Sequence, residues 1–215
     1  MGGCSSSESG DYKLYYFNAR GTTEPIRQLF ALAQIPFEDI RIEQDDWGNT
    51  KMNMPFGQLP VLEVNGEKLA QSASIMRYLA TKFGYAGKTD RERALIDSYF
   101  ELYKDYHAEA KTYFYMVVGL KEGNKEKAFK KTFIPARDRF FTYIEKQLKS
   151  NVENGFLVGE SPSYVDLQIA DHVETILQHH PLELSAFPEV LAHKKRVEAI
   201  PRLKKYLEDR PKTKF

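Results

Sequence analysis

Residues 12–42, YKLYYFNARGTTEPIRQLFALAQIPFEDIRI, decide the fold of this chain. The first six are rich in aromatic side chains and alternate, which predicts a buried strand. Pro25 suits the first turn of a helix, which continues at helical spacing through Ile26, Leu29, Phe30 and Ala33. Residues 36–42 predict a second strand, and the polar residues 45–54 after it predict a loose helix or loop. Strands joined through a helix run parallel, so this stretch predicts a β-α-β unit.

A hairpin and a helix complete this part of the chain. Strands over residues 61–64 and 68–70 flank Asn65-Gly66, a strong signal for a hairpin turn. Ser72 is expected to cap the next helix. The fold class is therefore α/β here: a mixed four-stranded sheet with helices on its faces, for which the thioredoxin-like arrangement is the simplest fit.

The pattern becomes all-helical after Gly87. The expected helices cover residues 90–120, 129–148 with a kink at Pro135, 164 to Pro181, 188–198 and 201–209. Ser163 and Asp166 have the spacing of a capping box at the start of the third. The chain thus divides into a mobile N-terminal tail (1–10), a thioredoxin-like domain (11–86) and an all-helical bundle domain (87–215).

Composition excludes several classes of function. The 215 residues carry 31 Lys and Arg against 30 Asp and Glu, and no basic block indicates nucleic acid as the main partner. No apolar run approaches the ~18 residues of a membrane span. The single cysteine, Cys4, excludes an intrachain disulfide framework and a cysteine-ligated zinc site. The histidines lack metal-ligand spacing, so no metal is expected; they are His107, His172, His179, His180 and His193.

Three features could carry chemistry, and each has a plainer interpretation. Tyr16 ends the first strand, where ligands bind in open α/β sheets, but most of the 13 tyrosines must serve packing. Gln71 and Ser72 open a helix whose free N–H groups suit a carboxylate or phosphate, or Ser72 is only a cap. Trp47 and Lys51, four residues apart, are a carboxylate clamp or part of a solvated surface.

A fourth feature is Gly57-Gln58-Leu59-Pro60, which precedes a strand. Proline at a strand start marks an edge, a tight turn or a cis bond. A cis bond would turn the Leu59 backbone outward, toward an extended peptide. An ordinary trans proline in a loop is the alternative.

Five motifs together resemble the glutathione S-transferase family, most closely the nematode members of the sigma class, with haematopoietic prostaglandin D synthase as a cousin. The motifs are YKLYYFNARG (12–21), RIEQDDW (41–47), MPFGQLPVLEV (54–64), LAQSASIMRYLA (69–80) and LVGESPSYVDL (157–167). Their order and spacing are far more specific than any one of them. The resemblance covers the chain from about Asp11 to Phe215 and implies a cytoplasmic homodimer.

The resemblance also implies roles for the residues above. Tyr16 matches the catalytic tyrosine and Pro60 the cis-proline that lets Leu59 pair with the cysteinyl unit of glutathione. Gln71 and Ser72 match the pair that holds the γ-glutamyl carboxylate. The full glutathione site is Tyr16, Trp47, Lys51, Gly57, Gln58, Leu59, Pro60, Gln71, Ser72 and, crossing from the partner subunit, Asp105.

The implied mechanism follows from thiol chemistry. A free thiol has a pKa near ~8.5, and only its thiolate is a good nucleophile. A hydrogen bond from Tyr16 to the sulfur would contribute roughly 1.5–3 kcal/mol, or about one to two pKa units. The expected reaction is conjugation of glutathione to hydrophobic electrophiles, in a pocket formed by Phe17, Ala19, Gly21, Thr22, Thr112 and Tyr113.

The chain departs from its cousin at several positions. Prostaglandin D synthase has arginine where Thr22 stands and tryptophan where Thr112 stands, and its metal-binding acids map to Glu101, Lys104 and Asp105, where the lysine breaks the cluster. Conjugation is therefore favoured over glutathione-dependent prostaglandin D isomerisation. A non-catalytic ligand-binding or structural relative is the third alternative.

The tail carries a separate motif. Residues 1–6, MGGCSS, fit the pattern M-G-x-x-x-[ST] for N-myristoylation at Gly2, with Cys4 available for palmitoylation. Two acyl chains hold a protein on a membrane stably, whereas one does so only marginally. The alternative is a short unmodified extension.

Overall fold

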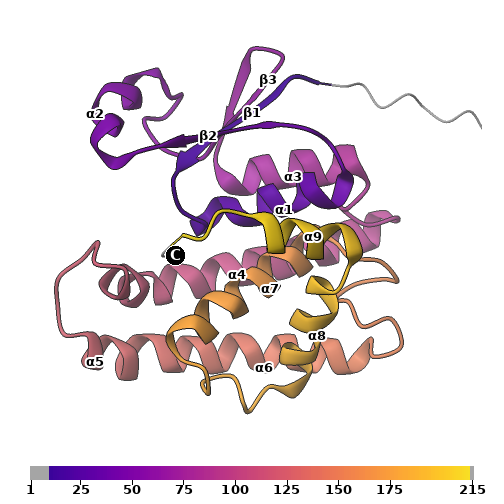
Figure 1. The fold of residues 1–215 in the computed structure, drawn as a ribbon. Helices are drawn as coiled ribbons and strands as arrows, with labels where there is room; N and C mark the ends of the chain where they lie inside the picture. Colours follow the sequence, from indigo (N-terminus) through magenta and orange to yellow (C-terminus); the bar gives the residue numbers. More distant parts are fainter. Residues whose placement is uncertain (1–9, 214–215) are drawn as a thin grey trace, which may run out of the picture.

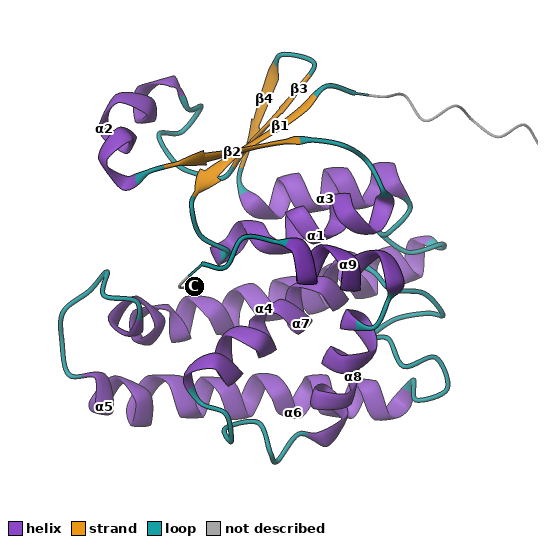
Figure 2. Ribbon diagram, in the orientation of Figure 1, coloured by secondary structure: helices purple, strands orange, loops and turns teal. Residues whose placement is uncertain are grey.

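The computed structural model describes residues 10–213, so the predictions for Gly2, Cys4 and most of the tail lie outside the described residues. The N-terminal part contains β1 (Tyr12–Phe17), α1 (Glu24–Ala33), β2 (Glu38–Ile42), β3 (Val61–Val64), β4 (Glu67–Ala70) and α3 (Ser72–Phe83). The sheet order is β2-β1-β3-β4, with β1 and β2 parallel and the other pairs antiparallel (Figure 2). The mixed four-stranded, thioredoxin-like sheet is thereby confirmed.

The two faces of this sheet are covered differently. Helices α1 and α3 lie between the sheet and the helical domain (Figure 1), where Leu14, Leu29 and Phe30 are fully buried. Full burial of such a side chain contributes roughly 1.5–3 kcal/mol. The other face carries a small cluster of Met54, Val61 and Ala70. The segment covering it consists of short turns: η2 (Gln44–Asp46), α2 (Trp47–Thr50) and η3 (Lys51–Asn53).

The helical domain contains α4 (Asp90–Val117), α5 (Lys125–Ala128), the π-helical turn η4 (Phe129–Phe133), α6 (Ile134–Ser150), α7 (Tyr164–His179), α8 (Pro188–Glu198) and α9 (Pro201–Asp209). The bounds predicted for α8 and α9 are confirmed. The expected end of α4 at residue 120 is wrong by three residues, and α5 was not expected. None of the helices within residues 10–213 is long and apolar enough to span a bilayer.

The helical run from α5 through η4 to α6 is continuous, and its irregularity, the π-helical turn η4, lies directly before Pro135, where the kink is expected. Pro135 itself lies in the first turn of α6. Proline has no N–H to donate, and the first turn of a helix needs none from it. The irregularity in the backbone therefore precedes the proline.

A buried polar network holds the start of α7. The capping box of Ser163 and Asp166 is confirmed, with both reciprocal hydrogen bonds present. The Asp166 carboxylate accepts from the backbone N–H groups of Leu157 at 2.9 Å and Ser163 at 2.8 Å, and from the Ser163 hydroxyl at 2.7 Å. The Nε2–H of His193, on α8, donates to it at 2.8 Å. One carboxylate thus joins a loop, α7 and α8.

The C-terminal end of the chain returns to the first domain. Helix α9 lies beside α1 (Figure 1). The Tyr206 hydroxyl donates to the Glu24 carboxylate at 3.1 Å, and the Arg210 guanidinium lies 2.7 Å from it. A single hydrophobic core runs through both domains, from Tyr12 to Leu203.

Candidate active site

Hydrogen-bonding register brings three of the predicted motifs to one end of the sheet. Tyr15 of β1 lies opposite Val61 of β3, and Val61 lies opposite Ala70 of β4. The next residues toward that end are Tyr16, Pro60 and Gln71. The motifs are far apart in sequence, but the sheet places them side by side.

The Tyr16 hydroxyl lies against the turn that follows β1. Both the backbone N–H and the side-chain hydroxyl of Thr22 donate to its oxygen, each at 3.4 Å. The guanidinium carbon of Arg27 lies 5.9 Å from the centre of the Tyr16 ring. Tyr16 is half-buried, so its ring is held while part of its surface stays accessible.

Gly21 makes room for this hydroxyl. It has φ +45°, a conformation that glycine adopts without strain, and a Cβ built on it would lie 2.5 Å from the Tyr16 oxygen. Any side chain at position 21 therefore competes with the tyrosine for the same space.

We expect Gly21→Ala to lower turnover several-fold to tenfold while changing the free energy of unfolding by only about 1 kcal/mol. The clash is with the tip of a side chain, so the tyrosine can move away without disturbing the backbone, and its hydroxyl leaves its position. Steady-state kinetics and urea unfolding measure the two effects. Gly66→Ala is the matched control, because Gly66 has φ +88° but open space around it. Full activity in Gly21→Ala would contradict the argument.

Buried charges hold the turn between Asn18 and Thr23. The Arg20 guanidinium lies 3.4 Å from the Asp171 carboxylate and donates to the Gln178 amide oxygen at 2.7 Å, both on α7. Arg27 donates to the Ala19 carbonyl at 2.7 Å. The sequence did not predict the roles of Arg20 and Asp171. The only available signal was Asp171 itself, a charged residue within the strongly apolar pattern of α7.

Burial raises the pKa of Asp171 to about 8; Glu24 and Glu174 act in the same direction, and Arg20 and Arg210 oppose them. In the unfolded chain its pKa is near ~3.9. Between these values the folded protein binds the additional proton, so this group makes the free energy of unfolding fall as pH rises from about 4 to about 8. We expect Asp171→Asn to flatten this part of the profile, measured by urea unfolding at several pH values. A slope in Asp171→Asn equal to that of the wild type would contradict the assignment.

Trp47 and Lys51 approach the same end of the sheet. The Trp47 ring meets Phe17 edge-on, with ring centres 5.5 Å apart. The Lys51 side chain passes Gly57, where a Cβ would lie 3.3 Å from its Cε. The structure therefore brings Trp47 to the end of β1 and Lys51 to the loop before β3.

The loop before β3 and the start of α3 have unusual backbone conformations. The Leu59-Pro60 peptide bond is cis, as the resemblance implied, and Gly57 has φ +58°. Gln71 has φ +76° and is the residue that precedes the helix, so the expectation that Ser72 caps α3 is wrong: Ser72 is its first helical residue. No side-chain hydrogen bond caps α3, which leaves its first N–H groups without that partner.

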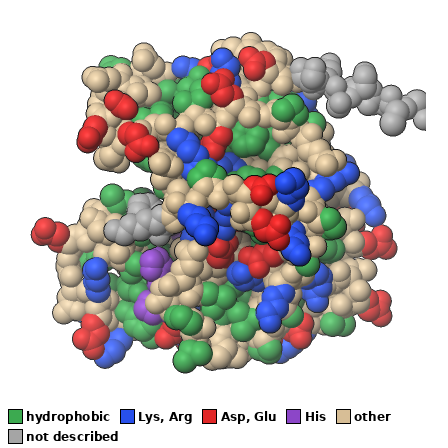
Figure 3. Space-filling model, in the orientation of Figure 1, with side chains coloured by type: hydrophobic (Ala, Val, Ile, Leu, Met, Phe, Trp, Pro, Cys, Tyr) green, Lys and Arg blue, Asp and Glu red, His purple; other side chains and the backbone are tan. Residues whose placement is uncertain are grey.

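The predicted electrophile-pocket residues are only partly together. Phe17, Gly21 and Thr22 lie against Tyr16, whereas Ala19 is buried and its carbonyl accepts from Arg27. Thr112 and Tyr113 come from α4; Tyr113 is only 3% exposed, and its hydroxyl is hydrogen-bonded to the His180 ring. Figure 3 shows the surface hollowed between the two domains below α2, with histidine side chains on the helical side.

Asp105 is exposed on α4, and no ion pair joins it to another of residues 10–213. One turn earlier, Glu101 pairs with Lys104 at 2.8 Å and with Arg77 of α3. Within residues 10–213, no three His, Cys, Asp or Glu side chains lie close enough together to hold a metal ion.

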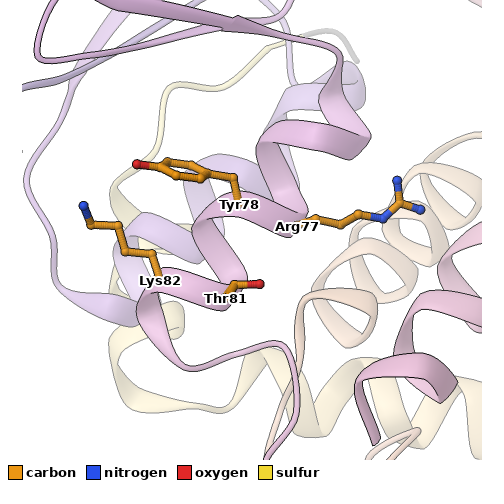
Figure 4. A pocket seen from close by; sticks show the side chains of 4 residues that line it. All are labelled: Arg77, Tyr78, Thr81 and Lys82. Carbon is orange, nitrogen blue, oxygen red and sulfur yellow. The ribbon is translucent and has the colours of Figure 1, made fainter. Parts of the chain in front are cut away.

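A separate hollow lies on the outer face of α3, lined by Arg77, Tyr78, Thr81 and Lys82 (Figure 4). Arg77 points to the side opposite Tyr78 and Lys82, and its guanidinium lies 2.6 Å from the Asp97 carboxylate of α4 (Figure 4). None of the four residues is among the predicted glutathione contacts. The hollow is open and belongs to the α3–α4 face of the molecule.

Comparison with known proteins accounts for this arrangement. The model of the glutathione S-transferase N-terminal domain matches residues 12–81, and that of the C-terminal domain matches residues 104–210. Probable glutathione S-transferase 5 of Caenorhabditis elegans is 45% identical over 206 residues, which are 95% of this chain and 99% of that protein.

Two solved structures extend the likeness. A Nu-class GST from Haemonchus contortus is 47% identical with a TM-score of 0.88, over 96% of this chain and 100% of that one. Prostaglandin synthase D of Nilaparvata lugens is 30% identical with a TM-score of 0.84, over 94% of this chain and 100% of that one. The chain therefore belongs to the glutathione S-transferase family.

Proposed function

We propose that this enzyme conjugates glutathione to hydrophobic electrophiles, and that Tyr16 stabilises the thiolate. The thiol proton leaves to solvent, and the Tyr16 hydroxyl donates a hydrogen bond to the sulfur anion. The anion attacks an electrophilic carbon: a C–S bond forms, and the leaving group departs with its bonding electrons. Tyr16 keeps its own proton throughout, so it acts on the anion and is not a general base.

The glutathione site of this proposal occupies the end of the sheet within residues 11–86. The Leu59 backbone pairs with the cysteinyl unit as an added strand would. Gln71, Ser72 and the free N–H groups at the start of α3 hold the γ-glutamyl carboxylate, where the helix dipole favours an anion. Trp47 and Lys51 reach the glycyl carboxylate. Gly57 and Gln58 shape the loop between Lys51 and Leu59.

The observation that carries the proposal is the position of the Tyr16 hydroxyl, at the sheet end where Pro60 and Gln71 also lie. The test is a titration of enzyme-bound glutathione, followed by the ultraviolet absorbance of its thiolate. We expect the pKa of the bound thiol to lie one to two units below ~8.5. A bound thiol that ionises as it does in buffer would refute the proposal.

The electrophile is proposed to bind within residues 87–215 and around Phe17, Ala19, Gly21 and Thr22, in the hollow between the domains. The alternative is a prostaglandin-type isomerase that uses glutathione as a cofactor, and the likeness to a prostaglandin synthase D favours testing it. Turnover of an aromatic chloronitro substrate against that of an endoperoxide separates the two. Lys104, paired with Glu101, is the feature that speaks against a metal-activated isomerase.

We further propose a homodimer in which Asp105 of the partner subunit reaches the γ-glutamyl ammonium group. The exposed, unpaired position of Asp105 on α4 supports this. Sedimentation equilibrium gives the mass, and Asp105→Asn should raise the KM for glutathione while leaving kcat at saturation unchanged. A monomer with full glutathione affinity would refute it.

Localisation depends on the N-terminus. We propose a cytoplasmic enzyme that becomes membrane-associated where Gly2 is myristoylated and Cys4 palmitoylated. Intact mass of protein from its native cells tests the modification, because each acyl chain adds a defined mass. An unmodified N-terminus would end this proposal.

A further inference from the structure

Thr22 directs two hydrogen-bond donors at a single atom, the oxygen of Tyr16. Its backbone N–H and its hydroxyl each lie 3.4 Å from that oxygen. No other hydrogen bond to the Tyr16 oxygen is present among residues 10–213. Both distances are longer than those of ordinary protein hydrogen bonds, and long hydrogen bonds in unliganded sites commonly tighten when the ligand binds.

We propose that Thr22 is a positioning residue for the reaction: it occupies the lone pairs of the Tyr16 oxygen, so that the tyrosine hydrogen is left to point at the thiolate. This inference rests on the proposed function, in which Tyr16 donates to the sulfur. Thr22 itself does not touch the reacting atoms in this account and acts through Tyr16.

The argument begins with the inventory of donors and acceptors. A phenol has one hydrogen to donate and two lone pairs to accept with. A backbone N–H can only donate, so the Thr22 amide fixes one lone pair. When the Thr22 hydroxyl donates to the other, the tyrosine hydrogen has no partner in the turn. It then points away from Thr22.

Polarisation adds to orientation. A hydroxyl that accepts hydrogen bonds becomes a stronger donor, by about 10–30% per bond. The two Thr22 donors therefore strengthen the hydrogen bond that Tyr16 makes to an anion. Gly21 contributes to the position of the Tyr16 hydroxyl because it has no side chain, which would otherwise occupy the space of that hydroxyl.

The choice of threonine is consistent with this role. Only serine and threonine can supply a hydroxyl donor on so short a side chain, and the β-branch of threonine restricts χ1. Thr22 is half-buried in the turn, so its rotamer is held on one side by protein. The position is thereby distinguished from a surface threonine whose hydroxyl faces water.

The experiment is a titration of bound glutathione in five proteins: wild type, Thr22→Val, Thr22→Ser, Tyr16→Phe and the double variant Tyr16→Phe/Thr22→Val. Valine keeps the shape and removes the hydroxyl; serine restores the hydroxyl. We expect Thr22→Val to raise the pKa of the bound thiol by roughly half a unit, which is about a threefold fall in the ratio of thiolate to thiol at a given pH. Thr22→Ser should stay near wild type.

The pH profile of kcat separates positioning from a general structural effect. Below the thiol pKa, Thr22→Val should be about threefold slower, and the difference should close at high pH, where the thiolate forms without assistance. The KM for glutathione should be unchanged. Thr142→Val, on α6 and far from the turn, is the matched control; its hydroxyl donates to a backbone carbonyl at 2.7 Å.

Three outcomes would overturn the inference. The first is a wild-type thiol pKa in Thr22→Val. The second is a lowered pKa, which would mean that the Thr22 hydroxyl accepts the tyrosine hydrogen and competes with the thiolate. The third is an equal shift when valine is introduced into Tyr16→Phe, which would mean that Thr22 acts without the tyrosine. Failure of the proposed function is distinguishable, because Tyr16→Phe alone would then leave the thiol pKa unchanged.

Discussion

Tyr16→Phe is expected to reduce turnover at neutral pH about 10- to 30-fold while leaving the fold and glutathione binding in place. A hydrogen bond of roughly 1.5–3 kcal/mol lowers the thiol pKa by about one to two units, and without it a thiol of pKa ~8.5 is only about 3% thiolate at pH 7, which sets the upper limit of the loss. Phenylalanine keeps the ring, so the contacts with Phe17 and Arg27 survive. The loss should shrink as pH approaches ~8.5, where free thiol ionises by itself. Steady-state kinetics across pH and the dissociation constant of glutathione are the measurements.

The matched control is Tyr15→Phe. Tyr15 is the preceding residue of β1 and points to the opposite face of the sheet, where its hydroxyl donates to Glu63 at 3.1 Å. Its hydroxyl can be removed without affecting the turn that contains Thr22. Unchanged turnover in Tyr16→Phe, or an equal loss in both variants, would refute the assignment of Tyr16.

Asp166→Ala is expected to lower the free energy of unfolding by about 3–5 kcal/mol. Asp166 is 0% exposed and accepts four hydrogen bonds. Removing the carboxylate leaves buried donors on Leu157, Ser163 and His193 without their acceptor, and each such group costs about 1–3 kcal/mol. The expected loss of about 3–5 kcal/mol is smaller than the sum of these separate costs, because the cavity left by the carboxylate admits relaxation of its surroundings or a water molecule. Urea unfolding followed by far-ultraviolet circular dichroism measures it.

Asp209→Ala is the control for this variant. Asp209 is exposed and pairs with Lys205 at 2.7 Å, one turn earlier on α9. Exposed ion pairs of this kind contribute little to stability because solvent screens them, so the free energy of unfolding should hardly change. A loss below about 1 kcal/mol in Asp166→Ala would show that the network is not a major source of stability.

The strands and most helices could be predicted because their signals are local. Proline at the first turn fixed the start of α8 and α9, the spacing of Ser163 and Asp166 fixed that of α7, and Asn65-Gly66 fixed the hairpin. Local signals failed where the backbone is governed by tertiary contacts. The positive φ of Gln71 is such a case, because glutamine has no intrinsic preference for that conformation.

The residues of the candidate site could be predicted from motifs that recur in a family, but the geometry of the site could not be predicted from them. Tyr16 could be placed at the end of a strand, but the two donors from Thr22 depend on how the turn folds back over the ring. Arg20 and Asp171 are 151 residues apart, and no periodicity links them. The burial of Tyr113 could not be anticipated either, since it depends on the helices packed against α4.

The contacts between α9 and α1 bear on the order in which the nascent chain can reach its final form. Glu24 is 1% exposed, yet Tyr206 and Arg210, which hydrogen-bond to it, are synthesised 182 and 186 residues later. Until they emerge, Arg27 at 3.5 Å is its only ion-pair partner in the described chain. Co-translational folding of the sheet can therefore begin early, but the charge within α1 is not fully compensated until α9 has been synthesised.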